Sequence, residues 1–154
     1  MKRFMKIRTL LPMLFLLLGS IPVSAVERPF ALRGTGVAPL IFDESGNLVG
    51  GTPTGSGTAT HLGQWTVSGN VKYTPENGVL KSSGQAIVTA ADGDKLLIEI
   101  DGILDPVAAV DQGIFHIVGG TGRFEGASGD ANFVVSINPL TGGFELTVVG
   151  KINF

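Results

Sequence analysis

Short runs of alternating apolar and polar residues, separated by turn-forming residues, set the strongest limit on how this chain folds. In residues 95–102, KLLIEIDG, apolar side chains occupy every second position, and Leu97 is the exception. This period of two is that of a strand with one face in the core and one face in water. Residues 91–94, ADGD, form a turn that joins it to an earlier run at 85–90. The sequence therefore predicts an antiparallel hairpin over residues 85–102.

The same pattern recurs along the chain, and no long helical period follows residue 25. Runs at 130–137 and 144–154 flank a turn at 138–143, and the second run ends on the apolar Phe154. We also expect strands at 30–38, 57–73 (one strand, or two joined at 68–70) and 112–118, a long connection at 39–53 and a turn at 75–78. About eight strands with hairpin connections favour a closed or nearly closed antiparallel β-barrel over a two-sheet sandwich, because closure removes exposed edges. The predicted fold class is all-β.

The first 25 residues have the layout of a secretory signal peptide. Four basic residues precede an apolar run from Leu10 to Leu18, and Val23-Ser24-Ala25 supplies small residues at the positions that a signal peptidase reads. The apolar run is shorter than the roughly 20 residues of a membrane-spanning helix. We therefore expect cleavage after Ala25, export to the periplasm or the medium, no stable membrane anchor after cleavage, and one domain at residues 26–154.

The mature chain would be acidic and free of cysteine. Four of the 11 Lys and Arg residues lie in residues 1–25 and none of the 13 Asp and Glu residues does, so cleavage changes the formal net charge from −2 to −6. This charge gives no electrostatic basis for binding nucleic acid or an anionic membrane. The lack of cysteine excludes thiol catalysis, disulfides and thiolate metal sites.

A glycine-rich stretch at 119–129, GGTGRFEGASG, allows two interpretations. As a phosphate loop it lacks the P-loop lysine, its spacing does not fit the dinucleotide fingerprint, and we expect a strand rather than a helix after it. As a structural motif, it ends one strand, bends the chain, sends a phenylalanine into the core and leaves room for close backbone approach. We favour the structural interpretation. The residues assigned this role are Gly119, Gly120, Gly122, Phe124, Gly126 and Gly129.

Residues 119–129 resemble the Gly-Gly-Thr-Gly-x-Phe-x-x-Ala-x-Gly signature of plant dirigent proteins and of the allene-oxide-cyclase-like barrels. Residues 58–66, TATHLGQWT, look like a companion motif in secreted bacterial proteins of the same general appearance. The resemblance implies an eight-stranded antiparallel barrel with an apolar interior. Allene oxide cyclase isomerises a fatty-acid epoxide in its barrel, and dirigent proteins steer the coupling of phenoxy radicals. The cavity residues of both lie outside the shared motif, so neither activity is carried over to this chain.

Two histidines and a tryptophan are the candidate ligand-binding residues. His116 alternates with apolar neighbours, and two places are open for it: the barrel interior, where it would meet a ligand, or a half-exposed face, where it is hydrogen-bonded. His61 is expected to orient a turn or to bond a carbonyl. Trp65 is expected to line the mouth of a pocket, a place that also suits Tyr73, while simple packing is the alternative for both.

No pattern in the sequence predicts a metal site or a cofactor. A zinc or copper site formed by His61 and His116 would lack a third ligand. Neither Asp92-Gly93-Asp94 nor the acids at 101–111 have the spacing of an EF-hand loop. No Gly-x-Ser-x-Gly elbow marks a nucleophilic serine.

Two classes of function stay open. The first is a non-catalytic module that holds a small apolar ligand in the barrel or presents its outer surface to a partner. The second is an isomerase or cyclase that uses the same cavity. An ionisable group with a shifted pKa inside an open cavity, such as His116 or Glu99, would favour the enzyme. Association into a homodimer or homotrimer through outer strand faces is a further open expectation.

Overall fold

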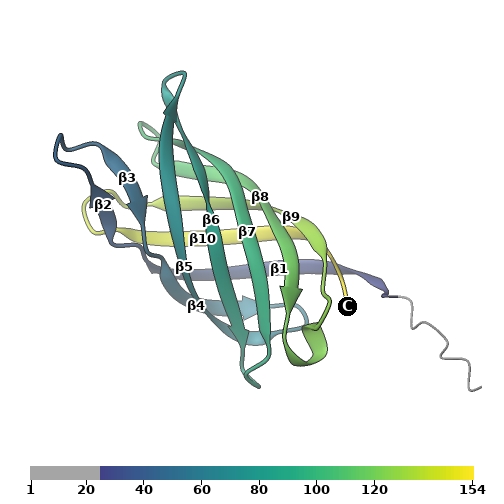
Figure 1. The fold of residues 1–154 in the computed structure, drawn as a ribbon. Helices are drawn as coiled ribbons and strands as arrows, with labels where there is room; N and C mark the ends of the chain where they lie inside the picture. Colours follow the sequence, from purple (N-terminus) through teal and green to yellow (C-terminus); the bar gives the residue numbers. More distant parts are fainter. Residues whose placement is uncertain (1–24) are drawn as a thin grey trace, which may run out of the picture.

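The computed structural model describes residues 25–154, and these residues form an antiparallel β-barrel (Figure 1). The expected signal peptide, apart from Ala25, lies outside the described residues. In chain order, the strands are β1 (Glu27–Val37), β2 (Leu40–Phe42), β3 (Leu48–Gly51), β4 (Thr54–Ala59), β5 (Gly63–Glu76), β6 (Val79–Ala90), β7 (Lys95–Asp105), β8 (Val110–Gly120), β9 (Gly129–Ile137) and β10 (Gly143–Asn153). In this part of the chain, no helix is long and apolar enough to cross a membrane.

Eight of these strands close into a ring. From β5 to β10, each strand pairs with its neighbour in sequence. β10 then pairs with β1, β1 with β4, and β4 with β5, which closes the ring. The prediction of a closed eight-stranded antiparallel barrel is confirmed. The expected hairpins at 85–102 and 130–154 are present as β6–β7 and β9–β10, and Asn77 and Gly78 make the expected turn with positive φ.

Three expectations for the elements are wrong. The connection at 39–53 contains the hairpin β2–β3. The break between β4 and β5 falls at residues 60–62, where His61 has φ +67°, and not at 68–70, because β5 stays paired with β6 through Gly69. Finally, β6 begins at Val79, six residues before the expected start.

The hairpin β2–β3, residues 40–51, extends from the ring and is called the flap below (Figure 1). It continues the register of β1 and β4, and within residues 25–154 its strands pair with the ring at two positions, Gly50 with Lys72 and Gly51 with Val71. Its turn is tied internally, since the Asp43 carboxylate accepts the backbone N–H groups of Ser45 and Asn47 at 2.9 and 2.8 Å. The flap is therefore firmer within itself than in its attachment to the barrel.

Two prolines weaken the ladder where the flap joins the barrel. The N–H of Thr52 donates to the carbonyl of Pro39 at 3.2 Å, but Pro39 has no N–H to return the bond. Likewise, the N–H of Gly69 donates to the carbonyl of Pro53 at 3.1 Å, and Pro53 cannot return it. Each proline thus removes one hydrogen bond on the line that separates the flap from the ring.

The amides of the flap are expected to exchange with solvent as one group, about tenfold or more faster than those of β5 and β6, because few bonds resist its opening. Restoring both donors in the Pro39→Ala/Pro53→Ala variant should slow this exchange by about tenfold, at about 0.5–1.5 kcal/mol for each bond. Hydrogen–deuterium exchange measures both effects. Pro75→Ala, in β5 beside the turn at Asn77, is the control and should leave flap exchange unchanged. Equal exchange in the flap and in β5 would contradict the hinge.

Aromatic side chains close the end of the barrel opposite the flap. Phe124 is fully buried, and its ring meets that of Phe154 edge to face with 5.1 Å between centroids. The guanidinium of Arg123 lies 4.7 Å from the centroid of the Phe124 ring. Phe30 and Ile152 are buried in the same core. The glycine-rich motif thus supplies the side chain that fills this end.

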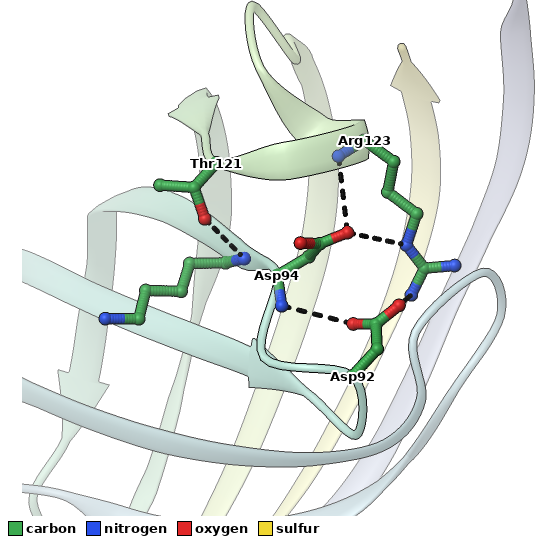
Figure 2. A network of polar contacts seen from close by, with 5 residues as sticks. Asp92, Asp94, Thr121 and Arg123 are labelled. Atoms are coloured by element: carbon green, nitrogen blue, oxygen red, sulfur yellow. Dashed lines mark hydrogen bonds and ion pairs between the residues drawn. The ribbon is translucent and has the colours of Figure 1, made fainter.

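A polar clasp, formed by Asp92, Asp94, Thr121 and Arg123, fastens this motif to the β6–β7 turn (Figure 2). The Arg123 guanidinium contacts the carboxylates of Asp92 at 3.0 Å and Asp94 at 3.4 Å. The backbone N–H of Lys95 donates to the Thr121 hydroxyl at 3.0 Å. A side chain at Gly122, where φ is +60°, would collide with the Asp94 carboxylate. Glycine at this position therefore allows the clasp to form.

The clasp also bears on the phosphate interpretation. Gly122–Phe124 form a single turn of 3₁₀-helix, η1, inside the glycine-rich stretch. The chain then continues into the strand β9, as expected. The N–H of Arg123 in this turn donates to the Asp94 carboxylate at 3.2 Å. An acid of the protein itself occupies the place that a phosphate would need.

Candidate ligand-binding cavity

The interior of the barrel contains a cavity of about 80 Å³. It is roughly half the size of an engineered apolar cavity of about 150 Å³ that takes up benzene. Apolar side chains from both halves of the ring line it, including Leu32, Val88, Ile98 and Phe133. The barrel is therefore neither filled completely nor wide enough for a bulky ligand in this conformation.

Strand glycines make room for the two large rings in the lining. A side chain at Gly34 would collide with the Trp65 ring, and one at Gly36 would collide with the Phe144 ring. Both glycines belong to β1, so the rings of Trp65 and Phe144 lie against bare backbone. The rings can then sit close to the wall of the barrel, and space remains in the middle.

The cavity reaches the end of the barrel that carries the flap. Ala38, Gly51 and Pro53, which flank the line where the flap joins the ring, are among its lining residues. Val71 and Ile137 also line it and are half-buried rather than buried. Solvent thus approaches the cavity from the flap end, whereas the opposite end is filled by Phe124 and its neighbours.

One ionisable side chain inside the barrel is hydrogen-bonded to a residue two strands away. Asp111 on β8 is 5% exposed, and its carboxylate accepts a hydrogen bond of 2.7 Å from the fully buried Ser82 on β6. β7 lies between these strands, and the residue opposite Ser82 there is Gly102. A side chain at Gly102 would meet the Ser82 hydroxyl. The glycine leaves open the path by which Ser82 reaches Asp111.

Burial shifts the ionisation of this group and of its neighbour Tyr73. Desolvation raises the pKa of Asp111 to about 6, and the hydrogen bond from Ser82 opposes this only in part. Desolvation also raises the pKa of Tyr73 to about 12, and the negative charge of Asp111 adds to the effect. Tyr73 and Asp111 both line the cavity. They give an otherwise apolar space a polar pole near the flap end.

Comparison with known proteins identifies the fold. No family model and no curated protein matches the sequence. The solved structure of the pterocarpan synthase dirigent protein PsPTS1 is similar, with a TM-score of 0.57 and 12% identity over 85% of this chain and 96% of that chain. That of the pterocarpan synthase dirigent protein GePTS1 has a TM-score of 0.54 and 16% identity over 84% and 86%. The chain has the dirigent-type barrel fold.

Trp65 lies in the lining of this dirigent-type barrel. The indole is buried, and its N–H finds no hydrogen-bond partner within residues 25–154. A buried donor without a partner costs about 1–3 kcal/mol, so a partner for this N–H would stabilise the barrel. Of the three candidate ligand-binding residues, Trp65 is the one that the fold brings to the cavity.

His116 lies on the outer face of the dirigent-type barrel, so its placement in the interior is wrong. Phe115 and Ile117 take the inward positions of β8, as alternation requires. The side chain of His116 is 39% exposed, and its Nδ1 lies 2.6 Å from the Asp130 carboxylate. This is the alternative of a hydrogen-bonded histidine on a half-exposed face. Glu99, opposite His116 on β7, is also exposed and does not enter the cavity.

His61 belongs to the turn between β4 and β5. Its Nε2 lies 2.8 Å from the Pro29 carbonyl, and because a carbonyl only accepts, Nε2 carries the proton and donates. Its ring meets that of Phe154 at 5.4 Å between centroids. The side chain bonds a carbonyl and orients a turn. In the described part of the chain, no group of three His, Asp or Glu residues is placed to hold a metal ion.

Sequence reasoning missed Asp111 and Ser82. The strand expected at 112–118 begins two residues after the observed start of β8 at Val110, so Asp111 fell outside it. Extended by one residue, the alternation places Asp111 on the same face as the inward Phe115 and Ile117. This alternation is the feature of the sequence from which the inward position of Asp111 could have been predicted. The serine gives no comparable signal, because its role depends on a glycine in the neighbouring strand.

Proposed function

We propose that the protein is a non-catalytic module that binds a small, largely apolar ligand in the cavity of its barrel. One observation carries the proposal: an unfilled apolar cavity with a polar pole at Asp111 and Tyr73, approached from the flap end. Sites of this kind, apolar with a few convergent polar groups, are typical of small-molecule binding. Trp65, whose indole N–H has no partner within residues 25–154, also lines the cavity and supports the proposal.

The similar structures support a small-molecule role without naming a ligand. Both belong to proteins described as pterocarpan synthase dirigent proteins, and a synthase acts on small molecules. A cavity of about 80 Å³ limits the ligand to a small molecule unless the flap end yields. We further propose that the chain is exported after cleavage behind Ala25 and associates with itself through outer strand faces.

A second function, an isomerase or cyclase in the same cavity, is favoured by one specific observation. The pKa of Asp111 is raised to about 6, so its carboxyl can give or accept a proton near neutral pH. An ionisable group with a shifted pKa in the cavity was the criterion set for an enzyme, and Asp111 meets it where His116 and Glu99 do not. If the cavity were found to hold the product of a reaction rather than an unchanged ligand, this alternative would be favoured.

Native mass spectrometry of the protein purified from the organism that makes it tests the proposal. We expect a small molecule retained by each chain and a chain mass that begins at Val26, and the number of subunits is read from the same spectrum. Val71→Phe places a ring in the cavity and should abolish retention. Val149→Phe, the same change at an exposed position of β10, should leave it intact. Retention by folded Val71→Phe, or its absence from the wild type, would contradict binding in the cavity.

A further inference from the structure

The formal charge in the described lining of the cavity is negative, and no positive charge balances it. Among the described residues that line it, Asp111 is the one that carries a formal charge, and no Lys, Arg or His accompanies it. Its carboxylate accepts one side-chain hydrogen bond, from Ser82. With its pKa at about 6, the group is ionised above neutral pH. A ligand that enters therefore meets a negative charge in a setting with no cation to balance it.

Because of this arrangement, two ligands of equal shape but different charge should bind with different affinities. A carboxylate in the cavity would lose its hydration and stand close to a second buried anion. At an effective dielectric constant of about 20, two like charges about 4 Å apart repel strongly. A hydroxyl group carries no charge and can donate a hydrogen bond to the Asp111 carboxylate, while its alkyl part meets the apolar lining.

We propose that the cavity selects its ligand by charge, taking up uncharged molecules and excluding those that would place a carboxylate beside Asp111. This rests on the proposed function, ligand binding in the cavity, and adds the class of ligand. It also limits the alternative reaction, because a fatty acid could not place its ionised head beside Asp111. Selection comes from Asp111 in the lining of the barrel, near the flap end, and needs no further charged residue.

Binding of pentan-1-ol and pentanoate, which share a chain length, tests the proposal. An NMR titration at about pH 7.5, above the pKa of Asp111, follows the methyl groups of Val67, Val71 and Val135 in the lining. We expect pentan-1-ol to shift these signals with an affinity about tenfold or more above that of pentanoate. In Asp111→Asn, pentanoate should gain about tenfold, and pentan-1-ol should change by less than about threefold. Glu99→Gln removes a charge from the outer face and should change neither.

The outcomes separate the two proposals. Equal affinities in the wild type, or pentanoate still excluded from Asp111→Asn, would overturn selection by Asp111 and leave cavity binding in place. If neither compound shifts a lining methyl group, the proposed function fails and the selection fails with it. A gain for pentanoate in Glu99→Gln equal to that in Asp111→Asn would also overturn the proposal, because general surface charge would then explain it.

Discussion

Replacement of Phe124 by alanine is expected to lower the free energy of unfolding by about 3–5 kcal/mol. Phe124 is 0% exposed, and its ring packs against Phe154 and beneath Arg123. Because the clasp fixes the backbone just before Phe124, at Thr121 and Arg123, we expect the surrounding chain not to collapse far into the space left behind. Urea unfolding followed by the fluorescence of Trp65, the single tryptophan, measures the loss.

The matched control is Phe42→Ala in the flap. Phe42 is 56% exposed, so the same substitution should cost less than about 1 kcal/mol. If Phe124→Ala cost no more than Phe42→Ala, the account of the glycine-rich motif as the device that seats a core side chain would be wrong.

Replacement of Asp111 by asparagine is expected to stabilise the protein above neutral pH and to have little effect in acid. Burial raises the pKa of Asp111 in the folded state from 3.8 to about 6. A raised folded-state pKa gives a contribution that is complete below pH 3.8 and is lost as the pH rises through about 6. Over that window the wild type should lose about 2–3 kcal/mol from this group, a loss that the neutral amide does not suffer.

Urea unfolding of both proteins at several pH values, from about 4 to about 7.5, measures this difference. The stability of Asp111→Asn relative to the wild type should rise across the window and then level off. Glu99→Gln, in an exposed position on β7, should show no such rise. A constant difference between Asp111→Asn and the wild type at every pH would show that Asp111 does not titrate in the folded barrel with a raised pKa.

The alternation of side chains predicted the barrel well where strands are long and one face is wet. In β7 and β10 the expected inward residues, such as Leu96 and Phe144, are buried. The flap was missed because its strands have three and four residues, too few to show a period, and because Pro39 and Pro53 suggest a connection. The break in 57–73 was misplaced because Ser68-Gly69-Asn70 has the composition of a turn, although Gly69 sits in an unbroken ladder with Ala86.

The cavity could be predicted only in part. For Trp65 and Tyr73 the sequence left the mouth of a pocket and simple packing open, and both side chains are buried in the lining of the cavity. The polar pole depends on Ser82, Gly102 and Asp111, which lie on three strands and come together only through the register of β6, β7 and β8. For His116, alternation against Phe115 and Ile117 leaves the outer face, and the structure places it there, hydrogen-bonded to Asp130.

The pairing of β1 with β10 has a consequence for the order in which the chain folds. Glu27 lies opposite Asn153 and Val37 opposite Gly143, so the seam joins segments more than a hundred residues apart. The hairpins from β5 to β10 can form between neighbours in sequence, but the ring stays open until residues 143–153 have been synthesised. Joining segments so far apart carries a large entropic cost, which makes such folding slow. Until then β1 exposes an unpaired edge that invites association between incomplete chains.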